Sequence, residues 1–71
     1  MSGSLENRLR DERARLGLTQ AELAQMVGVS RKTINTVENG VFIPSTLLAL
    51  KLAKALHRPV EELFVIAPDS G

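Results

Sequence analysis

Signals that begin and end α-helices recur along this chain at intervals too short for any long helix. Four hydroxyl-bearing residues can cap a helix by accepting hydrogen bonds from its first free amides, namely Ser4, Thr19, Ser30 and Ser45. Glycines, which adopt the left-handed conformation that ends many helices without a steric penalty, stand at Gly17, Gly28 and Gly40. The spacing therefore predicts several short helices that are stable only when they pack together.

Five helices are expected from these signals together with apolar residues at helical spacing. Their predicted ranges are 5–16, 20–27, 31–38, 46–57 and 60–64. Thr19 and Glu22 have the spacing of a capping box, and Pro59 suits the first position of the last helix because its missing N–H is not needed there. No stretch alternates in the way typical of β-strands, and the apolar residues 41–43 are expected to form a loop. The predicted fold class is all-α, a five-helix bundle.

The chain has 71 residues, enough for one compact domain, which is expected to span residues 4–67. Residues 1–3 and 68–71 are mostly small or polar and are expected to be disordered ends. Hydrophobic residues make up 44% of the chain, but only Phe42 and Phe64 are aromatic. The core must therefore be built from leucine, valine, isoleucine and alanine.

The composition offers little that could support catalysis or hold a metal ion. Cysteine is absent and His57 is the only histidine, so neither a thiolate site nor a clustered imidazole site is expected. Glu61 and Glu62 are adjacent and point to different helix faces, which rules them out as an acid–base pair. We expect no enzyme, no metal, no cofactor and no small-molecule ligand. The lack of disulfides, of an export signal and of any apolar run near the roughly 20 residues that span a bilayer predicts a cytoplasmic protein without a membrane partner.

The most informative segment is 20–39, QAELAQMVGVSRKTINTVEN, in which two short helices flank Gly28. A positive φ at this glycine lets the second helix cross the first steeply. Core positions at Ile34 and Val37 leave a polar set facing outward: Arg31, Lys32, Asn35, Thr36 and Asn39. Arginine can bond two acceptors of guanine, and asparagine can pair with the donor and acceptor of adenine. Because the net charge is only +1, DNA binding would depend on this local face and not on overall charge.

At these residues the chain closely resembles the Cro and phage-repressor (XRE) family of helix-turn-helix proteins. The resemblance covers residues 5–64 and runs through LGLTQAELAQMVGVSRKTINTVENG, PSTLLALKLAKAL and VEELF. It implies a lambda repressor-like DNA-binding domain whose third helix enters the major groove of double-stranded DNA. It also implies a transcriptional regulator, most often a repressor that binds a near-palindromic operator as a homodimer.

Site residues follow from the resemblance position by position. It implies base-edge contacts for Arg31, Lys32 and Thr36, with flanking contributions from Ser30, Thr33 and Asn35. It implies phosphate contacts for Gln20, for Asn39 and for the amides after Gly40. Arg13 and Glu38 match a pair that forms a salt bridge between the first and third helices in the family. Glu38, the one acid near the outward face, is accordingly expected to turn sideways toward the first helix.

The sequence departs from the usual family pattern in and after the fourth helix. Leu47 stands where a polar residue is typical, and four apolar residues are expected to be too exposed for a monomer: Leu47, Leu50, Val65 and Ile66. They are candidates for a dimer contact. They also leave open an alternative function, in which the same helical fold serves as a protein-interaction module or an antitoxin.

Overall fold

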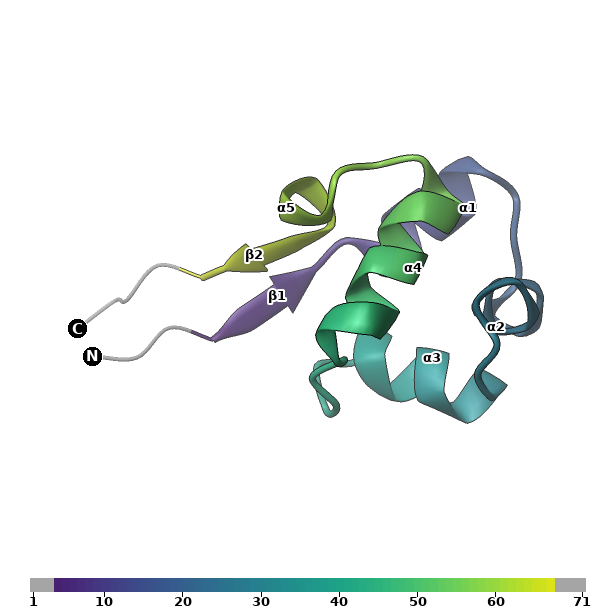
Figure 1. The fold of residues 1–71 in the computed structure, drawn as a ribbon, viewed down its shortest axis with the longest axis horizontal. Helices are drawn as coiled ribbons and strands as arrows, with labels where there is room; N and C mark the ends of the chain where they lie inside the picture. Colours follow the sequence, from purple (N-terminus) through teal and green to yellow (C-terminus); the bar gives the residue numbers. More distant parts are fainter. Residues whose placement is uncertain (1–3, 68–71) are drawn as a thin grey trace.

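The computed structural model describes residues 4–67, which form five helices and two short strands (Figure 1). In chain order the elements are β1 (Leu5–Asn7), α1 (Leu9–Arg15), α2 (Gln20–Val27), α3 (Arg31–Glu38), α4 (Thr46–Leu56), α5 (Val60–Leu63) and β2 (Phe64–Ile66). The predicted bundle of five short helices is therefore confirmed. The ends predicted to be disordered, 1–3 and 68–71, lie outside the described residues.

The starts of α2, α3 and α4 use the predicted capping residues. The Thr19 hydroxyl accepts a hydrogen bond from the Glu22 amide at 3.0 Å, and the Glu22 carboxylate accepts one from the Thr19 amide at 2.8 Å. These two bonds complete the capping box. Ser30 and Ser45 each accept a bond of 3.1 Å from the amide three residues further on. Local hydrogen bonding thus defines where each of these helices begins.

Gly28 makes the turn between α2 and α3. Its φ of 78° and ψ of 33° are left-handed, and its amide donates to the Ala24 carbonyl oxygen at 2.9 Å. The Val29 amide donates to the same oxygen at 3.0 Å, so the chain leaves α2 tightly and α3 begins at Arg31. The predicted hinge is confirmed, and Figure 1 shows α2 and α3 as separate, steeply crossing helices.

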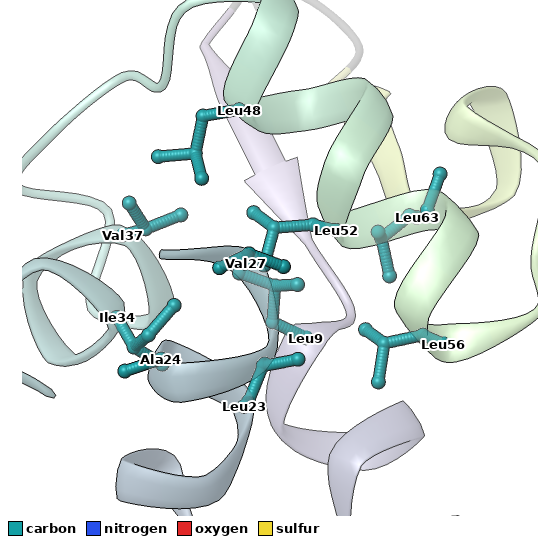
Figure 2. Close-up of a cluster of buried hydrophobic side chains, with 11 residues drawn as sticks. Leu9, Leu23, Ala24, Val27, Ile34, Val37, Leu48, Leu52, Leu56 and Leu63 are labelled. Atoms are coloured by element: carbon teal, nitrogen blue, oxygen red, sulfur yellow. The ribbon is translucent and has the colours of Figure 1, made fainter. Parts of the chain in front are cut away.

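The core lies between α4 and the helix pair α2–α3 (Figure 2). Its buried members come from α1 to α5 and are Leu9, Leu23, Ala24, Val27, Ile34, Val37, Leu48, Leu52, Ala53, Leu56 and Leu63. All are aliphatic, as the composition requires. Because Ile34 and Val37 are held in this cluster, the opposite side of α3 faces solvent.

The two ends of the domain pair as strands, which the sequence did not predict. β1 and β2 are antiparallel, with Leu5 opposite Ile66 and Asn7 opposite Phe64 (Figure 1). The expectations of a helix from residue 5 with a cap at Ser4, and of a fold without strands, were therefore wrong. The physical reason is that each strand is stabilised by a segment from the far end of the chain, which local periodicity does not reveal.

Helix α1 begins four residues later than predicted, at Leu9. Asn7 Oδ1 accepts from the Leu9 amide at 3.2 Å, in the role expected of Ser4. At the other end, Pro59 lies just before α5 instead of at its first position, and Phe64 belongs to β2. No helix within residues 4–67 is long and apolar enough to cross a membrane.

Candidate nucleic-acid interface

The first turn of α3 presents two cationic side chains to solvent. Arg31 and Lys32 are exposed, and neither forms an ion pair with another of the described residues. Their position follows from the Ser30 cap, which starts α3 immediately before them, and from Ile34, which is anchored in the core. The geometry leaves their donor groups available to an anionic or acceptor-rich partner.

The hydroxyl groups of this helix bond to their own turn. Ser30 Oγ and Thr33 Oγ1 are 2.9 Å apart, and Thr36 Oγ1 donates to the Thr33 carbonyl oxygen at 3.0 Å. Because the Thr36 hydroxyl uses its hydrogen within the helix, it offers lone pairs to a partner. Ser30 is exposed, whereas Thr33 and Thr36 are half-buried.

Glu38 is turned inward, and the expected pair with Arg13 is present. Arg13 Nε lies 2.7 Å from Glu38 Oε2, and Arg13 Nη2 donates to Oε1 at 3.3 Å. A third guanidinium nitrogen donates to the Leu18 carbonyl oxygen at 2.9 Å. The Glu38 side chain has no exposed surface, and the ion pair joins α1 to α3. The carboxylate nearest the outward face is thereby removed from it.

Two opposing effects act on the pKa of Glu38. Burial alone would raise it, because a charged carboxylate is poorly solvated there. Hydrogen bonds from Arg13 and Gln20, together with the positive charge of Arg13, outweigh burial and hold the pKa of Glu38 below its usual value. The same hydrogen bond raises the pKa of Arg13. Glu38 is therefore ionised at neutral pH.

Gln20, the first residue of α2, points its amide nitrogen into this network. Nε2 donates to Glu38 Oε1 at 3.0 Å and to Asn35 Oδ1 at 3.2 Å. Both hydrogens of the amide nitrogen are therefore used inside the protein. The structure brings Gln20 and Asn35 together, which sequence spacing did not predict.

Asn39, just after α3, is exposed and is bonded by an arginine that the sequence analysis did not single out. Arg10 Nη2 donates to Asn39 Oδ1 at 3.1 Å, and Arg10 Nε lies 3.5 Å from Glu38 Oε1. Arg10 precedes Arg13 by three residues on α1, so helical spacing alone places both on one side of that helix. That spacing was the available signal for Arg10.

In the loop after α3, two of the amides expected to hold a phosphate form hydrogen bonds within the protein. The Gly40 amide donates to the Val37 carbonyl oxygen at 3.1 Å. The amides of Val41 and Phe42 both donate to the Thr36 carbonyl oxygen, at 2.9 and 3.2 Å. These donors already have partners within the protein, and a phosphate contact from this loop stays a prediction. Residues 41–43 do form the predicted loop.

The four candidate dimer residues border different hollows of the surface. Leu50 lines an apolar groove with Leu5 and Phe64, and Ile66 adjoins it because it pairs with Leu5 across the sheet. Leu47 lines a different groove, between the α2–α3 turn and α4. Val65 is half-buried on the other face of the sheet, where the neighbouring hollow is lined mainly by charged residues. Leu50 and Ile66 are thus the two candidates beside the same groove, and Leu47 lies one turn before Leu50 on α4.

Within residues 4–67, no group of three or more histidine, cysteine, aspartate or glutamate side chains is placed to hold a metal ion. The polar side chains of α3 lie in front of the Glu38 network, and a second network joins Glu12 to Arg15 and Arg58. Donors dominate the surface around α3: two free cations and the amides of two asparagines.

Comparison with known proteins places this geometry in a family. The helix-turn-helix family matches residues 9–63. The uncharacterized HTH-type transcriptional regulator YgzD of Bacillus subtilis is 42% identical over 66 residues, which cover 93% of this chain and 100% of that protein.

Two solved structures are similar in fold as well as in sequence. The restriction-modification controller protein C.AhdI from Aeromonas hydrophila has a TM-score of 0.72 and 39% identity, over 76% of this chain and 82% of that one. The P22 c2 repressor, solved in complex with a synthetic operator, has a TM-score of 0.74 and 37% identity over the same shares. With the Gly28 turn and the exposed face of α3, these matches establish that the chain belongs to the helix-turn-helix family of DNA-binding transcriptional regulators, of the Cro and phage-repressor type.

Proposed function

We propose that this protein is a sequence-specific repressor that binds a near-palindromic operator in double-stranded DNA as a homodimer. The observation that carries the proposal is the exposure of Arg31 and Lys32 at the start of α3, while the nearest carboxylate, Glu38, is buried in an ion pair. An α-helix fits the major groove, and its first turn makes the deepest contact in this family. Cationic donors at that turn match the acceptors of guanine and the phosphates.

The side chains of α3 divide the work of recognition. Arg31 bonds two acceptors on a guanine edge, and Lys32 contacts a neighbouring base or phosphate. Thr36, with Ser30 and Thr33 beside it, supplies hydroxyl contacts to adjacent base edges. Asn39 holds a phosphate through its free Nδ2, which sets the register of the helix on the duplex.

Gln20 contributes from behind this surface. The resemblance assigns it a phosphate contact, but both hydrogens of its side-chain nitrogen bond to Asn35 and Glu38. A phosphate contact at this position therefore uses the backbone amide at the start of α2, where the first helical N–H groups have no partner within the helix.

A homodimer places two copies of α3 about 34 Å apart, one turn of the duplex. We assign the dimer contact to the groove that contains Leu50, with Ile66 at its border. Leu50 is 53% exposed and Ile66 75% exposed, and neither belongs to the α2–α3 pair. Covering this apolar surface with a second copy removes it from water and leaves α3 free.

The experiment is selection of bound sequences from a random duplex pool, followed by titration of the best site at several salt concentrations. A palindromic consensus and affinity that falls steeply with salt are expected. Arg31→Ala should weaken binding to the best site by about 1 to 3 kcal/mol and reduce discrimination at one base pair. Arg8→Ala is the matched control, because Arg8 is also an exposed arginine but lies outside α3.

Equal losses of DNA affinity for Arg31→Ala and Arg8→Ala would show that α3 does not recognise the base sequence. Salt-independent or absent binding to every duplex would favour the alternative, a protein-interaction module or antitoxin. The observation that supports this alternative is the exposed apolar surface, which includes Val41, Ile43 and Leu47 in addition to the Leu50 groove.

A further inference from the structure

Asn35 in α3 and Asn39 just after it share an arrangement. The side-chain oxygen of each accepts a hydrogen bond from another helix: Asn35 from Gln20, and Asn39 from Arg10. Both donors also lie on the same carboxylate oxygen, Glu38 Oε1, at 3.0 Å for Gln20 Nε2 and 3.5 Å for Arg10 Nε. Glu38 is thus the common element behind both amides.

The orientation of an asparagine or glutamine amide has to be argued from its partners, because oxygen and nitrogen have similar shapes. The guanidinium groups of Arg10 and Arg13 can only donate hydrogen bonds. Glu38 is ionised and can only accept. The Gln20 atom that faces Glu38 must therefore be its nitrogen.

The second hydrogen of that nitrogen fixes Asn35. Gln20 Nε2 lies 3.2 Å from the nearest Asn35 atom and directs this hydrogen at it, so that atom must be the acceptor, Oδ1. The orientation of the Asn39 amide follows directly from Arg10. Arg10 Nη2 can only donate, so the Asn39 atom 3.1 Å away must be the acceptor, Oδ1. In both residues the NH₂ group is left to face away from the network.

We propose that the Glu38 carboxylate locks the Asn35 and Asn39 amides so that both meet DNA only as hydrogen-bond donors, and that Asn35 thereby selects a site rich in acceptors. The proposal rests on the proposed DNA binding. Adenine recognition by asparagine uses the amide oxygen and nitrogen together. Gln20 holds the Asn35 oxygen turned toward α2, so that oxygen and the NH₂ group do not face a base together. Asn35 therefore bonds an acceptor such as guanine N7 or O6, or a phosphate oxygen, and does not form the two-bond pair with adenine.

The lock also affects Arg31. Residues four apart lie on the same side of a helix, so Asn35 presents its outward atom on the same side of α3 as Arg31. An oxygen there would accept from the guanidinium and divert it from the duplex. The NH₂ group cannot, which keeps Arg31 unpaired. Gln20 is in this sense a positioning residue for two DNA-facing side chains.

The first test needs no DNA. Side-chain amide hydrogen exchange, measured by NMR on the free protein, should show both Gln20 Nε2 hydrogens protected and the Asn35 and Asn39 Nδ2 hydrogens exchanging faster. Gln20→Met removes the donor and keeps the length of the side chain, so it should change the Asn35 amide resonances and leave those of Asn39 in place. Protected Asn35 hydrogens beside rapidly exchanging Gln20 hydrogens would overturn the proposal.

The second test measures binding to the selected operator. Asn35→Asp keeps the shape and the acceptor for Gln20 but replaces the outward NH₂ by a carboxylate oxygen, so affinity should fall at least about tenfold. Gln25→Glu is the matched control, because it makes the same chemical change at an exposed site on α2. Equal affinity of the two variants would overturn the proposal.

Gln20→Met distinguishes the two kinds of acceptor. If Asn35 bonds a base, freeing its amide should admit adenine, and the preference at one base pair should fall by about tenfold. If it bonds a phosphate, base preferences should stay the same and Asn35→Asp should weaken all sequences uniformly. A wild-type protein that binds no duplex would refute the proposed function, and the amide orientations in the free protein would still be measured.

Discussion

The α2–α3 pair and the β1–β2 pair are both made of short elements, but they are held together differently. The helix pair has side-chain caps, a left-handed glycine and a buried ion pair to α1. The strand pair has three opposed residue pairs, and Ile66 within it is 75% exposed. An isolated two-stranded sheet is only marginally stable in water, whereas interlocked side chains restrict α3 from several directions. The surface proposed to contact DNA is therefore the more rigid of the two.

This difference makes the sheet the place where local opening starts. Amide exchange should be fast in β1 and β2 and slow in the amides of α2 that bond within the core. In the proposed function, rigidity at α3 lowers the ordering cost of binding, and the less stable sheet end can adjust to the second copy of the proposed homodimer.

The largest expected effect on stability comes from a change in core packing. Ile34 in α3 has no exposed surface, so Ile34→Ala should lower the free energy of unfolding by about 3 kcal/mol through lost burial and a cavity. Ile66→Ala removes the same atoms from an exposed position and should cost less than about 0.5 kcal/mol. Urea denaturation followed by circular dichroism measures both. Similar losses at the two sites would contradict the comparison.

The next effect concerns the Glu38 carboxylate. Glu38→Gln removes the charge that faces Arg13 and should lower the free energy of unfolding by about 2 kcal/mol at neutral pH. The control Glu6→Gln makes the same change at an exposed site in β1 and should have little effect. Urea denaturation of both variants at pH 7 makes the comparison, and equal losses would show that the ion pair contributes nothing.

The same residue predicts a dependence on pH. Because hydrogen bonds from Arg13 and Gln20 outweigh burial and lower the pKa of Glu38, its contribution is fully present above the ordinary glutamate value. The contribution is lost as pH falls through the lowered pKa of the folded state. Glu12, whose pKa is lowered by hydrogen bonds from Arg15 and Arg58, acts in the same direction. Unfolding curves between pH 7 and pH 2 should show a shallower acid loss in Glu38→Gln than in the wild type.

Local signals were sufficient to predict the helix pair and insufficient for the sheet. Thr19, Gly28 and Ser30 act within a few residues of their own positions, so the limits of α2 and α3 could be predicted from the sequence. The partner of Leu5 is Ile66, and nothing near Leu5 distinguishes that strand from the first turn of a helix. Long-range pairing is a property of the assembled fold, and the helix predicted there was wrong for that reason.

The candidate site divides in the same way. Exposure of Arg31 and Lys32 follows from helical period, and the Arg13–Glu38 pair followed from the family resemblance. The bonds from Gln20 to Asn35 and from Arg10 to Asn39 depend on how α1 and α2 lie against α3, to within a few tenths of an ångström. No spacing rule within one helix supplies that information.

A smaller effect on stability is expected at two helix ends that share a left-handed backbone conformation. Gly28 after α2 and His57 after α4 are both left-handed, with φ of 78° and 58°. Gly28→Ala meets no atom within 4 Å, so its cost is conformational, about 1 kcal/mol. His57→Gly should relieve the same kind of strain and raise stability by up to about 1 kcal/mol. Thermal unfolding of the two variants should therefore shift in opposite directions, and a shift in one direction for both would contradict the assignment of strain.

The smallest effect on stability is expected at the Leu50 groove, where the consequence should instead be for assembly. Leu50→Ser combined with Ile66→Ser changes two exposed side chains and should alter monomer stability by less than about 0.5 kcal/mol. If a second copy covers this groove, the double variant should sediment as a monomer at concentrations where the wild type is dimeric, because two apolar contacts per copy are lost from the interface. Leu47→Ser, in the other groove, is the matched control and should leave the sedimentation coefficient unchanged. Dissociation caused by Leu47→Ser alone would show that the dimer contact lies beside the α2–α3 turn. The apolar surface of the sheet end would then not belong to the dimer interface.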